Sequence, residues 1–139
     1  MKQVLSILFL MVLLGSCSKN PEQFIPHLEG YWEIERVTLA DGTKKEYTIN
    51  ETIDFIAIND SLKGFRKKMK PRFDGKYETS NAVEELQLKV ENDSLNLYYS
   101  TKYAHWKETV LMANSSQLKI INENKAVFLY KRFTPITVE

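Results

Sequence analysis

The sequence contains a single cysteine, so no disulfide can form within the chain and the fold must be held together by packing. It also lacks an excess of either charge, because 19 basic and 18 acidic residues leave a formal net charge of +1. This balance provides no general attraction to nucleic acid. Hydrophobic residues make up 43% and aromatic residues 12% of the 139 positions, which is enough for one folded domain with a real core, and disorder is not expected.

Long apolar runs are absent except near the amino terminus, where an uncharged apolar segment at residues 4–14 follows Lys2. This segment is too short for a retained transmembrane helix, which needs about 20 residues. Gly15 and Ser16 then supply the small residues that precede a cleavage point, as in a secretory signal peptide. We therefore expect residues 1–16 to be a cleaved signal peptide.

The lone cysteine, Cys17, follows this segment directly. The sequence Leu-Gly-Ser-Cys resembles the bacterial lipobox, in which a dedicated peptidase cuts before the cysteine and the new amino terminus carries acyl chains such as palmitate. The resemblance implies a lipid-anchored protein of the cell envelope, because several acyl chains on one cysteine anchor stably. Ser18 in the next position favours the outer membrane by the same resemblance and leaves the leaflet, periplasmic or surface-exposed, open. The alternative is an ordinary signal peptide that leaves Cys17 as a free thiol.

A short polar segment punctuated by proline, SKNPEQFIPHL, connects Cys17 to the rest of the chain. This composition is typical of a tether that holds a domain away from a membrane. We therefore divide the mature chain into a lipidated tether at residues 17–28 and one folded domain at residues 29–139.

Sustained helical periodicity is missing between residues 30 and 133, where apolar and polar residues instead alternate between turn signals. The clearest case is a hairpin of residues 86–91 and 95–99 around the turn Asn92-Asp93. Eight or nine short strands joined by tight turns predict an all-β fold, a small antiparallel up-and-down β-barrel, with a two-sheet sandwich as the alternative. The other predicted strands are residues 31–39, 52–58, 62–70, 73–79, 105–112, 117–121 and 126–133.

Gly30, Tyr31 and Trp32 open the first predicted strand, and Arg132 lies at the end of the last one. This Gly-x-Trp resembles the start of lipocalins and related small barrels, in which the tryptophan plugs the closed end and an arginine packs over its ring. The segments GFRKKMKPRFDGKYE, ENDSL and WKETV are similar to those of lipocalin-like lipoproteins of Gram-negative bacteria, a family mostly without assigned activity. The resemblance spans residues 28–133 and implies structural roles for Trp32 and Arg132. An eight-stranded barrel of this kind can hold one small ligand.

The sequence contains few residue patterns that are typical of catalytic or metal-binding sites. The two histidines, His27 and His105, have no third nitrogen or sulfur ligand at metal spacing, so a metal site is not expected. Glu84 and Glu85 are adjacent and would point to opposite faces of a strand, which prevents them from working as an acid pair. Neither a Gly-x-Ser-x-Gly turn nor a glycine-rich phosphate loop is present. We expect no enzymatic activity and no cofactor.

The densest run of charge lies in the predicted strand at residues 62–70 and just beyond it. It consists of six basic residues with no acidic residue among them: Lys63, Arg66, Lys67, Lys68, Lys70 and Arg72. Alternation places Phe65, Lys67 and Met69 on one face and Arg66 and Lys68 on the other. We expect a solvated outer face that guards against edge pairing. The alternative is a docking site for anionic lipid headgroups, an anionic glycan or an acidic envelope protein.

The segment HWKETVLM, residues 105–112, places Trp106, Glu108 and Met112 on its more apolar face, which we expect to line the barrel interior. A carboxylate there is costly unless it is paired or bound, and its pKa rises if it is left alone. Glu108 therefore either lies near the rim, where it reaches water or pairs with an inward lysine such as Lys67 or Lys131, or anchors a ligand that carries a donor or a positive charge.

The function expected from the sequence is non-covalent binding of a small apolar or amphipathic ligand inside the barrel, because closed barrels offer a concave, mostly apolar pocket. The alternative is an envelope interaction module whose barrel is filled by its own side chains. The residues expected to contact the ligand are Phe55, Tyr77, Tyr99, Trp106 and Glu108.

Overall fold

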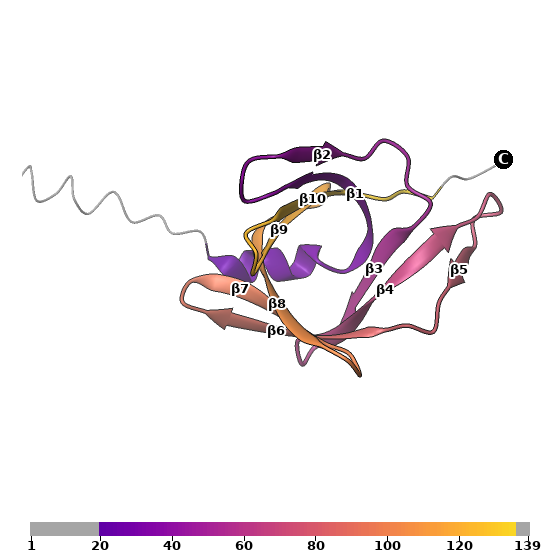
Figure 1. The fold of residues 1–139 in the computed structure, drawn as a ribbon. Helices are drawn as coiled ribbons and strands as arrows, with labels where there is room; N and C mark the ends of the chain where they lie inside the picture. The colour runs from indigo at the N-terminus through magenta and orange to yellow at the C-terminus, as the bar shows by residue number, and fades with distance from the viewer. Residues whose placement is uncertain (1–19, 136–139) are drawn as a thin grey trace, which may run out of the picture.

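The computed structural model describes residues 20–135. The expected signal peptide, Cys17 and the beginning of the expected tether therefore lie outside the described residues. The two ends of the described chain lie apart in Figure 1, with the carboxyl end beside the β4–β5 hairpin.

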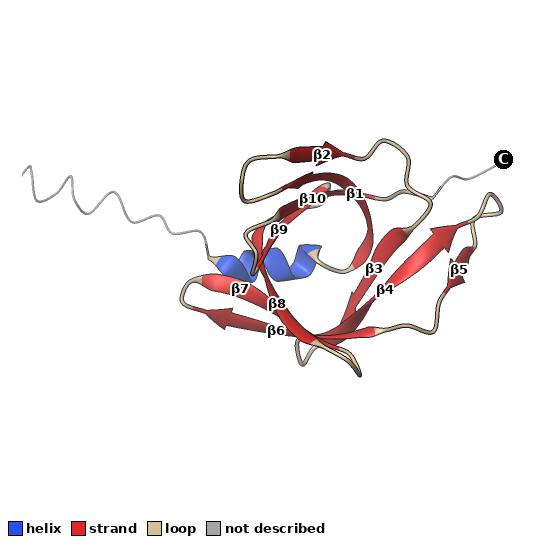
Figure 2. Cartoon of the chain, viewed as in Figure 1, coloured by secondary structure: helices blue, strands red, loops and turns tan. Residues whose placement is uncertain are grey.

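Ten strands form one antiparallel sheet, preceded by a 3₁₀ helix, η2 at Pro21–His27. Eight of the strands pair in the order β10-β9-β8-β7-β6-β4-β3-β1, and pairing of β10 with β1 closes the barrel (Figure 1). The short strands β2 and β5 lie outside this ring and pair with β1 and β4. Figure 2 shows that strands dominate the fold, so the all-β up-and-down barrel expected from the sequence is confirmed. The strands are β1 Gly30–Thr38, β2 Lys44–Glu46, β3 Ile53–Ile58, β4 Lys63–Pro71, β5 Tyr77–Thr79, β6 Glu84–Glu91, β7 Ser94–Ser100, β8 His105–Ala113, β9 Gln117–Asn122 and β10 Val127–Arg132.

Two short elements differ from the expected strands. The strand expected at residues 73–79 is mostly a turn, in which Gly75 adopts a φ of 78°, and only β5 remains extended. Strand β2 was not expected, because its three residues are polar and all exposed. Strand β2 lacks the apolar alternation from which a strand is recognised in a sequence.

The segment expected to be a tether is part of the folded domain from Pro21 onward. Asn20 caps η2, and Pro21 stands at its start, where a missing N–H is tolerated. Phe24 and Ile25 pack against the barrel core, and Leu28 is fully buried. Helix η2 contacts β7 and β8 and lies across one end of the barrel, which we call the closed end (Figure 1). The tether is therefore shorter than the sequence predicted.

The interior of the barrel is filled by alternate residues of its strands. Leu95 and Leu97 of β7 and Leu86 and Leu88 of β6 are at most 3% exposed, and the strand pairing places Leu88 beside Leu97 and Leu86 beside Tyr99. Each side chain of this size contributes roughly 1.5–3 kcal/mol when it is fully buried. The core is completed by residues of the other strands, namely Trp32, Ile56, Tyr99, Val110, Ala113, Leu118, Ile120 and Tyr130.

A register shift in β8 changes which residue reaches this core. The pairing of β8 with β9 slips between Val110 and Met112, so Met112 pairs with Lys119 and Ala113 pairs with the buried Leu118. A β-bulge of this kind exchanges the two faces of a strand. The expected inward position of Met112 is therefore wrong, and the small Ala113 takes its place.

Candidate functional site

A buried arginine on β4 organises the middle of the barrel. Arg66 Nε and Nη2 each lie 2.7 Å from a carboxylate oxygen of Glu84, and Nη1 lies 3.4 Å from both oxygens of Glu108. The same Nη1 lies 3.3 Å from the hydroxyl oxygen of Tyr99, and the guanidinium carbon is 4.2 Å from the centre of that ring. Trp106 stacks on Tyr99 with 5.3 Å between ring centroids. Strands β4, β6, β7 and β8 thus meet at one charged and aromatic cluster.

The position of Arg66 corrects the expected orientation of β4. Arg66 pairs with the buried Ile56 of β3, so Arg66 points into the barrel and its neighbour Lys67 points outward. Glu108 faces inward as expected, but its partner is Arg66 and neither of the two lysines considered from the sequence. Lys131 instead lies 3.9 Å from a carboxylate oxygen of Glu33.

The environment of this cluster changes the proton affinities of its members. Burial raises the pKa of Glu108 above its ordinary value, although Arg66 opposes the shift. Burial alone would lower the pKa of Arg66, but Tyr99, Glu108 and Glu84 together raise it, so the guanidinium stays charged. Burial likewise raises the pKa of Tyr99, which remains a neutral phenol. The cluster therefore contains a fixed positive charge next to a carboxylate that binds protons more readily than usual.

A second ion pair lies beside the first. Asp54 of β3 is 4% exposed, and Lys68 Nζ lies 2.6 Å from its Oδ1, while no donor of hydrogen-bond geometry reaches that oxygen among the described residues. Asp54, Arg66, Tyr99 and Tyr130 also border the interior cavity, together with apolar side chains. This cavity has a volume of about 10 Å³, which is about the space of one water molecule. The part of the barrel that the structure describes is thus filled by its own side chains.

The five residues expected to contact a ligand fall into two groups. Tyr99, Trp106 and Glu108 belong to the interior cluster, as expected. Phe55 and Tyr77 lie on the outer surface and face away from it, so their expected place inside the barrel is wrong. The interior therefore brings together three of the five residues and adds Arg66, which the sequence did not suggest.

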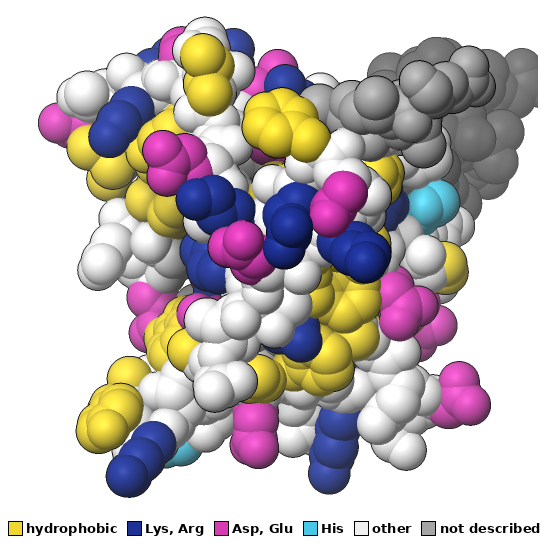
Figure 3. Space-filling view, turned by 90° about the vertical axis from the view of Figure 1, so that its right-hand side faces the viewer, with side chains coloured by type: hydrophobic (Ala, Val, Ile, Leu, Met, Phe, Trp, Pro, Cys, Tyr) yellow, Lys and Arg dark blue, Asp and Glu magenta, His cyan; other side chains and the backbone are white. Residues whose placement is uncertain are grey.

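Phe55 and Tyr77 belong to an aromatic cluster outside the barrel. Tyr31 stacks on Tyr77 with 4.6 Å between centroids, and Phe55 lies 4.7 Å from Tyr31 and 6.0 Å from Phe65. Phe133, beyond β10, approaches Tyr77 at 6.5 Å. Figure 3 draws the side on which the β4–β5 hairpin lies in Figure 1, and hydrophobic side chains lie there among basic and acidic ones. Apolar residues of β3 and β4 are therefore covered on the outside as well as on the inside.

Trp32 and Arg132 close the barrel at the end where η2 lies. Trp32 is fully buried, its Nε1 donates a hydrogen bond of 2.9 Å to the carbonyl oxygen of Leu28, and the guanidinium of Arg132 lies 3.7 Å from its ring centre. Arg132 also donates hydrogen bonds to the carbonyl oxygens of His27 and Glu29. This arrangement supports the structural roles that the sequence implied for both residues.

The basic run on β4 does not form one continuous outer stripe. Arg66 and Lys68 take part in interior ion pairs, and Arg72 lies within 4.0 Å of carboxylates of Asp74 and Glu78. Lys63 and Lys67 lie on the outward face of β4, whereas Lys70 is exposed on the same face of the strand as Arg66 and Lys68. The basic run is therefore divided between the two faces of β4, and the side chains of Lys68 and Arg72 are still 64% and 52% exposed.

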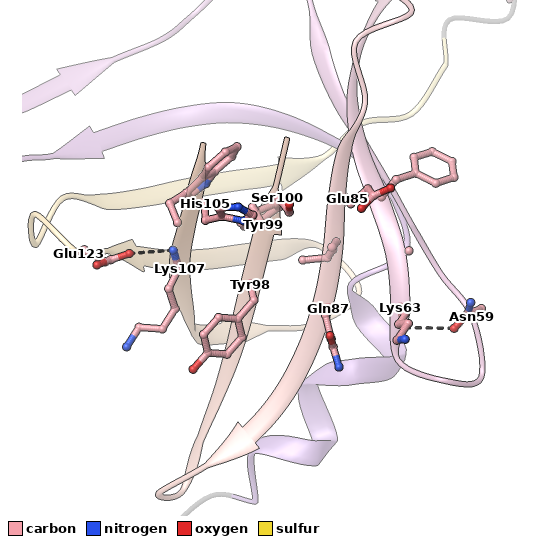
Figure 4. Close-up of a pocket in the computed structure, with 14 residues that line it drawn as sticks. Asn59, Lys63, Glu85, Gln87, Tyr98, Tyr99, Ser100, His105, Lys107 and Glu123 are labelled. Atoms are coloured by element: carbon pink, nitrogen blue, oxygen red, sulfur yellow. Dashed lines mark hydrogen bonds between the residues drawn. The ribbon is translucent and has the colours of Figure 1, made fainter. Parts of the chain in front are cut away.

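A wide groove lies on the outer wall of β4, β6, β7 and β8. Strand pairing aligns Lys63, Gln87, Tyr98 and Lys107 in one row across these strands, on the face opposite the buried Leu86 and Tyr99. Figure 4 shows Gln87, Tyr98 and Lys107 side by side on neighbouring strands. The groove has a volume of about 860 Å³. A second row completes its wall, namely Phe65, Glu85, Ser100 and His105.

Hydrogen bonds hold two sides of this groove in place. The hydroxyl of Tyr98 donates to Glu91, and the backbone N–H of Lys107 donates to Glu123 at 2.8 Å. Hydrogen bonding to Tyr98 lowers the pKa of Glu91, so this acceptor is a carboxylate at neutral pH. The sequence analysis did not identify the groove, although the polar and aromatic residues at the outward positions of β6 and β7 were the available signal.

Other classes of site find no support among residues 20–135. This range contains no group of three histidine, cysteine or acidic side chains that could hold a metal ion. It also contains no helix that is both long and apolar enough to cross a bilayer.

Comparison with known proteins agrees with the fold. The model of the lipocalin-like domain family matches residues 28–120 of the chain. Among solved structures, a lipocalin-like protein from Bacteroides uniformis is similar with a TM-score of 0.48 and 12% sequence identity, over 77% of this chain and 99% of that one. No curated protein matches the chain. Because the family model covers most of the barrel, in which Trp32 and Arg132 also close one end, the chain belongs to the lipocalin-like domain family.

Proposed function

We propose that this protein is a lipid-anchored component of the bacterial cell envelope that binds a small amphipathic molecule non-covalently on the outer wall of its barrel. The anchor is Cys17, and the outer membrane is the proposed location, from the resemblance of the leader to lipoprotein signals. The binding role is non-catalytic and needs neither a cofactor nor nucleic acid. The ligand position differs from the interior site that the sequence suggested.

The choice of binding site rests on the volumes of the interior cavity and the outer groove. The interior cavity of about 10 Å³ has no room for a ligand, whereas the outer groove of about 860 Å³ lies in the range of small-molecule sites, roughly 300–1,000 Å³. Its lining suits an amphipathic molecule, because the rings of Phe65 and Tyr98 supply apolar surface. Gln87 and the ammonium groups of Lys63 and Lys107 supply polar contacts beside them.

Native mass spectrometry of the protein purified from its own host tests this proposal. We expect a retained adduct of small mass in the parent protein. Gln87→Trp should place a bulky ring in the middle of the groove, obstruct binding there and remove the adduct. Lys89→Trp is the matched control, because Lys89 is the next outward and exposed position of β6 but does not line the groove. An adduct that survives Gln87→Trp, or that both variants lose, would contradict a site in the groove.

The lipid anchor is tested separately by labelling cells with a radioactive fatty acid. Cys17→Ser should abolish incorporation and leave the precursor uncleaved, because both acylation and cleavage by the lipoprotein peptidase need the thiol. Equal incorporation into parent and variant would remove the proposed anchor.

A second candidate function follows from the filled interior. A barrel whose inside is occupied by its own core can act as an envelope interaction module that docks through its outer surface. The partly exposed aromatic cluster around Tyr31 and Phe55 favours this candidate. Parent protein that carries no adduct after purification from its own host would favour the interaction module over ligand binding.

A further inference from the structure

The segment that follows the proposed anchor is locked to the last strand of the barrel. Arg132 donates hydrogen bonds from Nη1 to the carbonyl oxygen of Glu29 at 2.7 Å and from Nη2 to that of His27 at 2.9 Å. The ring of Trp32 lies under the same guanidinium and donates to Leu28, which is fully buried. The end of η2 is thus a fixed part of the barrel and cannot serve as a spacer.

The remaining spacer is very short. Three residues, 18–20, separate Cys17 from Pro21. A chain advances at most about 3.6 Å per residue, so Pro21 lies within roughly 14 Å of Cys17 whatever the conformation between them. Strands as long as the nine residues of β8, tilted as barrel strands are, give the wall a height of roughly 20 Å. The spacer is therefore shorter than the distance from η2 to the opposite, open end.

We infer that the closed end of the barrel, formed by η2 and the β8–β9 turn, is the surface that faces the lipid headgroups of the membrane. The inference rests on the lipid anchor proposed at Cys17. The β8–β9 turn belongs to this end because Arg132 Nε donates to the carbonyl oxygen of Ser115 at 3.2 Å. Glu22 and Glu29 are exposed here and acidic, so the short spacer, and not attraction to anionic lipids, keeps this end at the membrane.

The orientation decides how the groove is reached. Its rows run across β4, β6, β7 and β8, so it opens on the side wall of the barrel, and Ser100, His105 and Glu123 extend it toward the open end. A ligand therefore approaches parallel to the membrane surface.

Two exposed turn residues at opposite ends of β9 provide a matched test. Ser115 precedes β9 at the closed end, and Asn124 follows it at the open end. Each is replaced by cysteine in the full-length acylated protein, in which Cys17 is blocked by its lipid. The new thiol is labelled with a fluorophore, and the protein is inserted into phosphatidylcholine vesicles that carry a nitroxide quencher on the headgroup.

Quenching at Ser115→Cys should exceed quenching at Asn124→Cys by about twofold or more, because the six residues of β9 separate the labels by roughly 20 Å. Insertion of a Gly-Ser spacer after Ser18 should reduce this difference. Equal quenching at both sites with the short spacer, or stronger quenching at Asn124, would overturn the orientation while leaving the anchor in place. A parent chain that takes up fluorophore at Cys17 and fails to float with the vesicles would overturn the anchor itself, and the inference with it.

Discussion

Arg132 occupies the space that a side chain at position 30 would need. Substituting Gly30 and Arg132 singly and together therefore tests how Arg132 and Trp32 close this end of the barrel. Gly30 adopts a φ of 125°, a conformation that side chains strongly disfavour. A Cβ atom at this position would lie 2.5 Å from Arg132 Nη1. Gly30→Ala should therefore strain the backbone and also displace the guanidinium from Trp32 and from the carbonyl groups that it binds.

The two contributions can be separated by magnitude. Backbone strain of this kind costs about 2 kcal/mol, within the general range of 1–3. Loss of the Arg132 contacts costs about 2 kcal/mol, because a half-exposed cation over a ring and hydrogen bonds to partly solvated carbonyls are each worth ~1 kcal/mol or less. Gly30→Ala should thus cost about 4 kcal/mol and Arg132→Ala about 2. The double variant should also cost about 4 kcal/mol, because the displaced arginine is lost only once.

Urea unfolding followed by circular dichroism measures these free energies through the midpoint and the slope of each transition. Gly42→Ala is the matched control, since Gly42 also has a positive φ, of 88°, but its added Cβ would meet nothing within 4 Å. In the double variant, the loss of unfolding free energy caused by Gly42→Ala should add to that caused by Arg132→Ala. If the costs of Gly30→Ala and Arg132→Ala also add to within about 0.5 kcal/mol, Arg132 does not occupy the space above Gly30 and the reasoning fails.

Three further substitutions test the interior. Trp32→Ala should lower the free energy of unfolding by roughly 3–5 kcal/mol, and an unchanged urea midpoint would show that the ring is no plug. Arg66→Met should cost about 3–5 kcal/mol at neutral pH, because it leaves Glu108 buried without its counter-charge. That cost should shrink as the pH falls and Glu108 takes up a proton, so a cost independent of pH in thermal melts would refute the pairing. In the parent protein, burial raises the pKa of Glu108 in the folded state above its ordinary value of 4.5. Protonated Glu108 therefore stabilises the fold in acid, and this stabilisation is lost as the pH rises through the pKa of the folded state. Glu108→Gln should remove this loss, and calorimetry that shows the same decline in the parent and the variant would contradict it.

The barrel could be predicted from the sequence because its signals are local. Alternation of apolar and polar residues in β6 and β7 indicated which side chains share a face of the sheet. Turn residues such as Asn92 and Asp93 indicated where one strand ends and the next begins. Trp32 and Arg132 indicated the first and last strands of the barrel. These features depend on neighbouring residues and on short-range backbone preferences, which a sequence displays directly.

The orientation of β4 could not be predicted in the same way. Alternation separates the two faces of a strand but identifies the inner face only where the other face is left to solvent. Here the outer side of β3 and β4 is also covered, and Ile53 and Met69 are buried there outside the main core. The more apolar face of β4 therefore points outward, and the charged Arg66 points inward, where it meets Glu108.

Helix η2 at the closed end was not predicted from the sequence, for a different reason. Its two prolines and polar residues are typical of a linker, and a helix this short has no independent stability. The available signals were Asn20 before Pro21 and the spacing of Phe24, Ile25 and Leu28. Packing against the barrel stabilises this helix, and packing is not visible in a local pattern.

The hydrogen bonds of Arg132 also set an order of events in folding. They join residues 103 and 105 positions apart, so the carbonyl groups of Glu29 and His27 cannot bind Arg132 until the last strand has been made. Contacts between distant parts of a chain form slowly, because a long loop must close first. For the export and processing at Cys17 proposed above, this delay would leave the processing site accessible while the chain is still incomplete. Because β1 pairs with β10, the barrel closes only on a chain whose final strand has arrived.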